Sequence, residues 1–111
     1  MKRFGLPKKD LLKTNREFNR VYQVGRRLYG DGFIIIYLAN NRLQSRLGIS
    51  VQRKVGSAVQ RNRIKRLVRE VFRLHRDQFP EQADIVVAVR PGMSWKTAHT
   101  LHEAMVSVLR H

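Results

Sequence analysis

The chain has 111 residues, which is enough for one domain with a single modest core. Its 23 Lys and Arg face only eight Asp and Glu, so the formal net charge is +15. Such a charge indicates a polyanionic partner, with nucleic acid as the first candidate and an anionic membrane as the second. The absence of cysteine excludes disulfides, thiolate metal sites and a cysteine nucleophile.

The N-terminal residues are basic and contain no hydrophobic stretch long enough for a signal peptide. We interpret residues 1–9 as a flexible basic arm of a single RNA-binding domain that spans residues 1–111. The apolar run at residues 33–39 is too short to cross a bilayer. We therefore expect a cytoplasmic protein with no membrane partner and no obligate protein partner.

The first helix is predicted to begin at a capping box of Thr14 and Glu17 and to end at Gly25. Phe18 and Tyr22 lie four residues apart and so share one face of this helix. Aromatic rings beside cations suit single-stranded nucleic acid, because every base has a face that can stack. The alternative is that both rings pack in the core.

Three strands are predicted next. Residues 26–29 fit a short edge strand, and residues 33–39 are apolar on both faces, as in a central strand covered on both sides. Residues 46–52 alternate between apolar and polar side chains. The polar face includes Gly48 and Ser50 and is small, so another group could lie closely against it. The alternative is an ordinary solvated sheet face.

A basic amphipathic helix is the strongest signal in the chain. It is predicted to begin at a capping box of Ser57 and Gln60 and to run to about Asp77. Its apolar stripe consists of Ile64, Leu67, Val68, Val71 and Phe72. The neighbouring arc contains Arg61, Lys65, Arg66, Arg69, Arg73 and Arg76, with Asn62 in its middle and Arg63 at its far edge.

This arc favours phosphate binding, because like charges at this spacing repel and phosphates would neutralise them. Arginine can grip phosphate with two parallel hydrogen bonds. Arg53 and Lys54 come just before the helix N-terminus, where free amides can hold another phosphate. The alternatives are a solvated charged face and a helix that lies on a membrane surface.

A strand over residues 85–90 and a last helix, for which Ser94 is a possible N-cap, complete an α+β pattern with helices packed on a mixed sheet. The acids are sparse and scattered, which disfavours a protein-held metal nuclease. His99, His102 and Glu103 could hold a metal, although such groups are more often surface residues. We therefore expect no catalytic residue, metal or cofactor within the protein itself.

The run Arg61-Asn62-Arg63-Ile64-Lys65-Arg66, with Arg69-Glu70 after it, resembles the signature of the bacterial ribonuclease P protein family. Supporting matches over residues 17–22, 46–54 and 84–90 extend the resemblance to most of residues 11–90. It implies an α-β-β-β-α-β-α fold of the ribosomal protein S5 domain 2-like type, with a mixed four-stranded sheet. It also implies a left-handed crossover through the basic helix, although right-handed crossovers are the default.

The resemblance implies a function as well. The partner would be a large catalytic RNA that removes the 5′ leader of precursor tRNA with its own bound magnesium, and the protein would be a non-catalytic subunit. The resemblance implies that the catalytic RNA is contacted by Arg61, Asn62, Arg63, Lys65, Arg66 and Arg69. It also implies that a cleft for the single-stranded leader is lined by Phe18, Tyr22, Ser50, Arg53, Lys54 and Arg90.

Two other functions remain open from the sequence. One is a ribosome-associated or general RNA-binding protein with no role in tRNA processing. The other is a DNA-binding regulator, although nothing like a helix-turn-helix precedes the basic helix.

Overall fold

The computed structural model describes residues 6–110, and their elements follow the predicted order. Three helices and four strands make up the fold, with three short 3-10 turns between them. The helices are α1 (Asn15–Val24), α2 (Ala58–Leu74) and α3 (Ala98–Leu109). The strands are β1 (Arg26–Gly30), β2 (Phe33–Ala39), β3 (Arg46–Val51) and β4 (Ala83–Val89).

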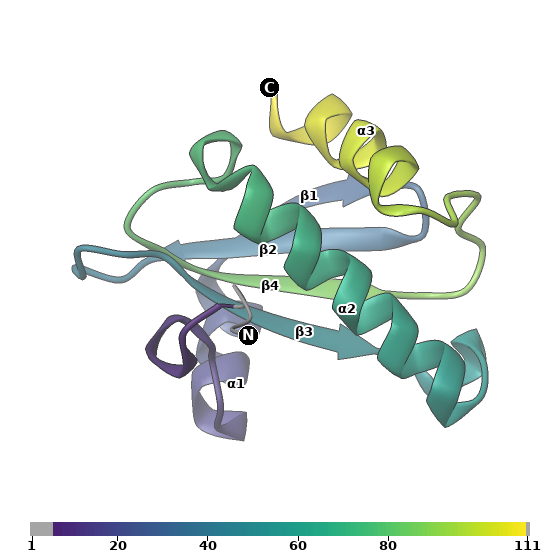
Figure 1. Cartoon of the computed structure of the whole chain (residues 1–111). Helices are drawn as coiled ribbons and strands as arrows, with labels where there is room; N and C mark the ends of the chain where they lie inside the picture. Colours follow the sequence, from purple (N-terminus) through teal and green to yellow (C-terminus); the bar gives the residue numbers. More distant parts are fainter. Residues whose placement is uncertain (1–5, 111) are drawn as a thin grey trace, which may run out of the picture.

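The four strands form one mixed sheet in the order β1-β2-β4-β3. β2 is antiparallel to both of its neighbours, whereas β3 and β4 are parallel. The connection between the parallel strands runs through α2, which crosses one face of the sheet, and its hand is left (Figure 1). The structure therefore confirms the mixed sheet and the rare crossover that the resemblance implied.

The helices divide between the two faces of the sheet. α2 and α3 pack side by side on one face, and α1 lies on the other (Figure 1). Alternation along each strand sends one set of apolar side chains to each face. The face under α2 and α3 carries the larger core, which includes Phe33, Ile35, Phe72, Ile85 and Leu101, all almost fully buried. We call it the covered face, and the side under α1 the open face.

The edge of β3 is partly covered by the N-terminal segment. Leu11 forms a parallel bridge with Leu47, and the Leu12 amide donates to the Leu47 carbonyl at 2.9 Å. Just before it, Lys8–Asp10 form a 3-10 turn. Residues 1–5 of the arm predicted over residues 1–9 lie outside the described residues. Leu6, within the same predicted arm, packs against the larger core.

Two predicted helix boundaries were wrong, whereas the strand ends differ from the prediction by one or two residues. α2 ends at Leu74 instead of about Asp77, because His75 leaves helical geometry with φ −129° and ψ 37°. The N-cap of α3 is Thr97, whose side chain accepts from the Thr100 amide. Ser94 instead donates its hydroxyl and its backbone N–H to Asp31.

No helix among residues 6–110 combines the length and the apolar character needed to cross a membrane.

Candidate nucleic-acid interface

The open face is only partly covered, because α1 packs on it through few side chains. Val21 is fully buried there and forms a second, small core with Ile36, Val86 and Leu12. The capping box of Thr14 and Glu17 that begins the helix is present as predicted. The surface beside α1 therefore remains accessible along much of the sheet.

Gly48 determines how closely α1 approaches the sheet. A Cβ atom at this position would lie 2.7 Å from Cζ of Phe18 and 3.0 Å from Cδ1 of Leu12. Such distances are too short for real carbon contacts, so only glycine leaves room for the ring. The group expected to lie against this small polar face is thus a ring of the same chain.

An ion-pair network fixes the start of α1 to the sheet. Arg46 donates to Asp84 through Nη2 at 2.7 Å and through Nε at 2.9 Å, and its Nη1 donates to Glu17 at 3.0 Å. Asn40 donates to the same Asp84 carboxylate at 3.0 Å. The side chains of Arg46 and Asp84 are 12% and 8% exposed, so the pair is screened from solvent.

The network changes the pKa of its acids. Hydrogen bonds from the backbone amides of Lys13 and Thr14, together with the charge of Arg46, lower the pKa of Glu17 from 4.5 to about 2. Burial alone would raise the pKa of Asp84, but hydrogen bonds from Arg46 and Asn40 outweigh it and lower the pKa. Both carboxylates are therefore charged at neutral pH, which keeps the anchor of α1 intact.

Beside α1 runs a row of small or aliphatic side chains. Ser50 is level with Ala88, which stands opposite Ile34, so the three share the open face. Phe18 and Tyr22 are half-buried and, like Ile34, pack against the small core on this face. We call these five residues the open strip.

The predicted cations of the leader site follow the ends of two neighbouring strands. Arg53 and Lys54 are exposed in a 3-10 turn directly after β3, and Arg90 is exposed directly after β4. Ser50, Arg53, Lys54 and Arg90 therefore lie at or just after the carboxyl-terminal ends of two neighbouring parallel strands. Phe18 and Tyr22 pack against the small core, as the alternative interpretation predicted, but they are only half-buried, so part of each ring remains accessible.

The basic helix α2 buries its apolar stripe as predicted, with Leu67 half-buried and the other four members buried. On its outer surface Asn62, Arg66 and Arg69 are exposed. Arg61 is half-buried and donates to the Gly56 carbonyl at 3.1 Å, which leaves its other N–H groups available. Lys65 is also half-buried.

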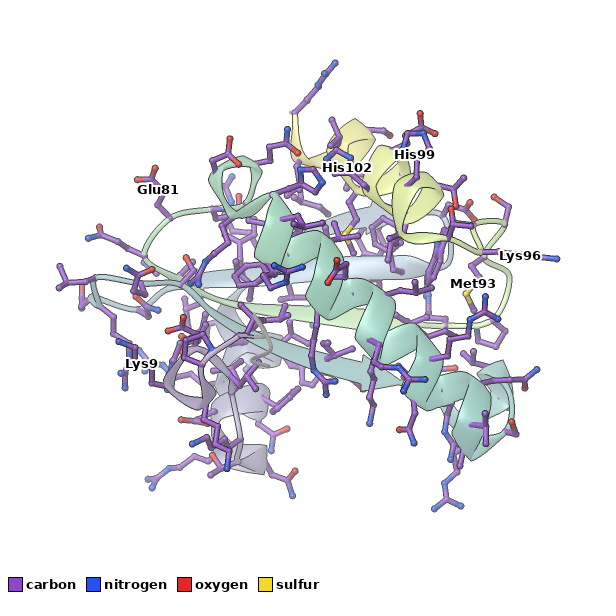
Figure 2. The ribbon with its side chains drawn as sticks, viewed as in Figure 1. Lys9, Glu81, Met93, Lys96, His99 and His102 are labelled. Atoms are coloured by element: carbon purple, nitrogen blue, oxygen red, sulfur yellow. The ribbon has the colours of Figure 1, made fainter. Side chains whose placement is uncertain are left out.

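Arg63 is exposed and lies at the far edge of this arc, as predicted, roughly 60° around the axis from Arg66. With Gln60 it lines a pocket of about 350 Å³ between α2 and the loop after β4. Met93 and Lys96, labelled in that loop in Figure 2, line the same pocket. The six residues predicted to contact RNA thus form one continuous arc of α2, and only Arg63 at its edge borders this pocket.

Arg76 does not belong to the basic arc, and this part of the sequence interpretation was wrong. Its Nη1 donates to the buried Asp10 at 2.9 Å, and its Nη2 donates to the Ser45 carbonyl at 2.9 Å. Its guanidinium also lies 4.9 Å from the centroid of the Phe72 ring. Arg73 is engaged as well, in an ion pair with Glu70 at 3.0 Å.

The histidines of α3 face different neighbours. His99 lies 3.4 Å from Glu103, whereas His102 stacks on His75 of the preceding helix end with ring centroids 3.6 Å apart (Figure 2). Burial, and then the nearby His75, lowers the pKa of His102. Among residues 6–110, no three His, Asp or Glu side chains come together in a way that could hold a metal ion.

The sequence did not predict the Arg46–Asp84–Glu17 network. The signal for the network was an arginine on the polar face of one strand and a lone aspartate at the start of another. The parallel register that joins them could not be known beforehand. Arg27 and Tyr29 of the edge strand β1 also project from the open face, because they pair with Ile36 and Ile34 of β2.

Together these features define a small basic α+β protein with a cationic helix on one side and half-exposed rings on the other. Such a combination is typical of proteins that bind nucleic acid. The family model described as Ribonuclease P matches residues 6–111. The chain belongs to this family, and its members take part in tRNA processing.

Relatives and solved structures agree with this assignment. The ribonuclease P protein component of Desulfotalea psychrophila is 53% identical over 97% of this chain and 90% of its own length. That of Dictyoglomus thermophilum is 40% identical over 95% and 89%. The solved structure of the RNase P protein from Thermotoga maritima superposes with a TM-score of 0.81 at 34% identity, covering 91% of this chain and 96% of that one.

Proposed function

We propose that this protein is the non-catalytic subunit of a ribonuclease P, and that it binds the catalytic RNA and the single-stranded 5′ leader of precursor tRNA on separate surfaces. One observation carries this proposal. In a chain of this family, the exposed cations of α2 and the half-exposed rings of the open strip lie on opposite sides of one sheet.

The α2 surface suits a folded RNA. Arg66 and Arg69 project from a rigid helix, and Arg61 is oriented by its hydrogen bond to Gly56. Guanidinium groups at fixed positions can each grip a phosphate with two hydrogen bonds. This contact would depend strongly on salt, because every neutralised phosphate releases counterions.

The open strip suits a single strand. Phe18 and Tyr22 can each stack a base without regard to its identity, and Arg53 with Lys54 can neutralise the phosphates that follow. The Ser50 hydroxyl, at the floor of the strip, can donate or accept a hydrogen bond with the bound RNA strand. The leader would then be held by its shape and charge rather than by its sequence.

Cleavage itself would be performed by the partner RNA with its own magnesium. The protein would contribute by holding leader and catalytic RNA together and by reducing phosphate repulsion between them. Less magnesium would then be needed for the same rate. No catalytic residue, metal or cofactor of the protein is part of this proposal.

The test is a cleavage assay at low magnesium. Purified protein is added to a bacterial ribonuclease P RNA with precursor tRNA as substrate, and the cleavage rate is measured with each component omitted in turn. We expect strong stimulation of the RNA and no cleavage by the protein alone. Tight RNA binding without stimulation would instead indicate a general RNA-binding protein.

Two variants separate the surfaces. Arg66→Ala should weaken binding to the catalytic RNA and reduce its salt dependence by about 1 in slope. Arg42→Ala removes the same charge from the exposed β2–β3 loop and serves as its control. Phe18→Ala should leave binding to the catalytic RNA unchanged and weaken precursor tRNA more than mature tRNA.

A further inference from the structure

An exposed ring on the edge strand lies outside both surfaces described so far. Tyr29 of β1 is 62% exposed, whereas Phe18 and Tyr22 are half-buried against the small core. Edge strands commonly carry charged side chains that prevent pairing with other chains, and single exposed aromatics are ordinary. The position of Tyr29 therefore decides whether its exposure has a use.

The register of the sheet aligns Tyr29 with the open strip. Tyr29 stands directly opposite Ile34, which is opposite Ala88, which is level with Ser50. Directly paired residues project from the same face. These four side chains therefore form one row across all four strands, and the row is roughly 14 Å long at the usual strand spacing.

Helix α1 follows the same direction beside this row. Near its start, Phe18 lies against Gly48 of β3, and at its end Gly25 lies against Ile36 of β2. Arg27 of β1 then donates to the carbonyl of Tyr22 at 2.7 Å. The rings of Phe18 and Tyr22 therefore lead from β3 toward β1, and Tyr29 stands where the row reaches the sheet edge.

The surroundings of Tyr29 are cationic. Arg27 is two residues away on the same strand and so projects from the same face, and both are exposed. Asp31 lies two residues beyond Tyr29 in the chain and accepts hydrogen bonds from Ser94, whereas Asp84 lies toward the other end of β4 and pairs with Arg46. The hydrogen bond that Arg27 donates goes to the neutral carbonyl of Tyr22, so its guanidinium can still bind a phosphate that approaches this end of the row.

We propose that Arg27 and Tyr29 extend the open strip across the edge strand, so that Tyr29 stacks one further base of a single-stranded RNA and Arg27 contacts a neighbouring phosphate. This inference rests on the proposed binding of the leader to the open strip. It assigns β1 to RNA binding, in addition to α1, β3 and the turn after β3. The occupant is single-stranded, because a base must be free to lie on the ring.

The experiment measures the affinity of the protein–catalytic RNA complex for precursor tRNAs whose leaders are lengthened one nucleotide at a time. For the unmodified protein, affinity should rise in steps as successive bases reach their rings. Tyr29→Thr keeps a strand-forming residue but removes the ring. It should abolish one of these steps and weaken long leaders about fivefold, while Tyr29→Phe should keep the step.

The charge of Arg27 is tested with a control variant at the neighbouring Arg26. Arg26 and Arg27 are adjacent and exposed, but Arg26 pairs with Tyr37 and so belongs to the covered side. Arg27→Ala should lower the salt dependence of leader binding by about 0.7 in slope, whereas Arg26→Ala should not. Because Arg27 also bonds Tyr22, thermal unfolding of each variant checks that α1 remains in place.

The outcomes distinguish this inference from the proposed function. If leader length has no effect on the affinity of the unmodified protein, leader binding itself is wrong and both proposals fall. If leaders do add affinity and Phe18→Ala reduces it, but Tyr29→Thr matches the unmodified protein at every length, only the extension to β1 is overturned. Equal losses for Tyr29→Phe and Tyr29→Thr would also overturn it, because the ring would not be the cause.

Discussion

The two faces of the sheet are built from the same strands but are closed in different ways. On the covered face, α2 and α3 bury a continuous apolar cluster that includes Phe33, Phe72 and Leu101. On the open face, only four buried residues form the core between α1 and the sheet, and an ion-pair network around Arg46 fixes the start of α1. Stability therefore resides mainly on one face, which leaves the other free to present half-buried rings to a ligand.

The largest expected effect lies on the covered face. Phe72 is fully buried and meets Phe79 edge to face at 5.1 Å. Phe72→Ala removes this ring from a packed core and should lower the free energy of unfolding by about 3–5 kcal/mol. Urea denaturation measures the loss. A loss below 1 kcal/mol, on the order of one buried CH₂, would show that the covered face does not carry the stability.

The ion-pair network is the next test of the comparison. Asp84→Asn keeps the shape of the side chain but leaves Arg46 without its closest counter-charge. Removing one partner of a buried pair costs about 3–5 kcal/mol, and we expect the lower end because asparagine retains one acceptor. Urea denaturation should show this loss, and Asn40→Ala, which removes only a neutral donor to Asp84, should cost less. Equal losses would mean that the charge of Asp84 is unimportant.

The sequence predicted the elements well where the relevant contacts are local. Capping boxes at Thr14 and Ser57 involve residues three apart, and both formed as expected. The failures depend on distant partners. α2 ends early where His75 stacks on His102 and Arg76 reaches Asp10, and these partners are far away in sequence. Local periodicity contains no information about such contacts.

The predicted RNA-binding residues show the same limit. A helical wheel correctly separates the apolar stripe of α2 from its cations, because both depend only on spacing. It could not tell that Arg76 is used inside the protein, since Asp10 lies 66 residues away. Nor could it reveal Tyr29 as a neighbour of the open strip, because that position follows from the pairing of β1 with β2.

Gly48 offers a smaller and more selective perturbation of the open face. An added Cβ would lie 2.7 Å from the ring of Phe18, so Gly48→Ala should displace that ring. Overpacking of this kind costs about 1–3 kcal/mol, and we expect the lower end because the ring is only half-buried. Affinity for precursor tRNA with a leader should fall, while binding to the catalytic RNA through α2 should be unchanged. An equal loss of both would mean that the two surfaces are not independent.

The smallest expected effect is the pH dependence of the α1 anchor. The pKa of Glu17 is lowered from 4.5 to about 2 in the folded protein. The stabilisation from its charged form is therefore complete above pH 4.5 and is lost as the pH falls toward about 2, because the unfolded chain binds the proton first. Glu17→Gln can still accept from the amides of Lys13 and Thr14 but has no charge to lose. Its unfolding free energy, measured by urea denaturation across this range, should fall less steeply than that of the unmodified protein. Asp84, whose pKa is also lowered, titrates in both proteins and sets the common background. Identical slopes would mean that the charge of Glu17 adds nothing to the anchor and that its amide contacts alone fix the start of α1.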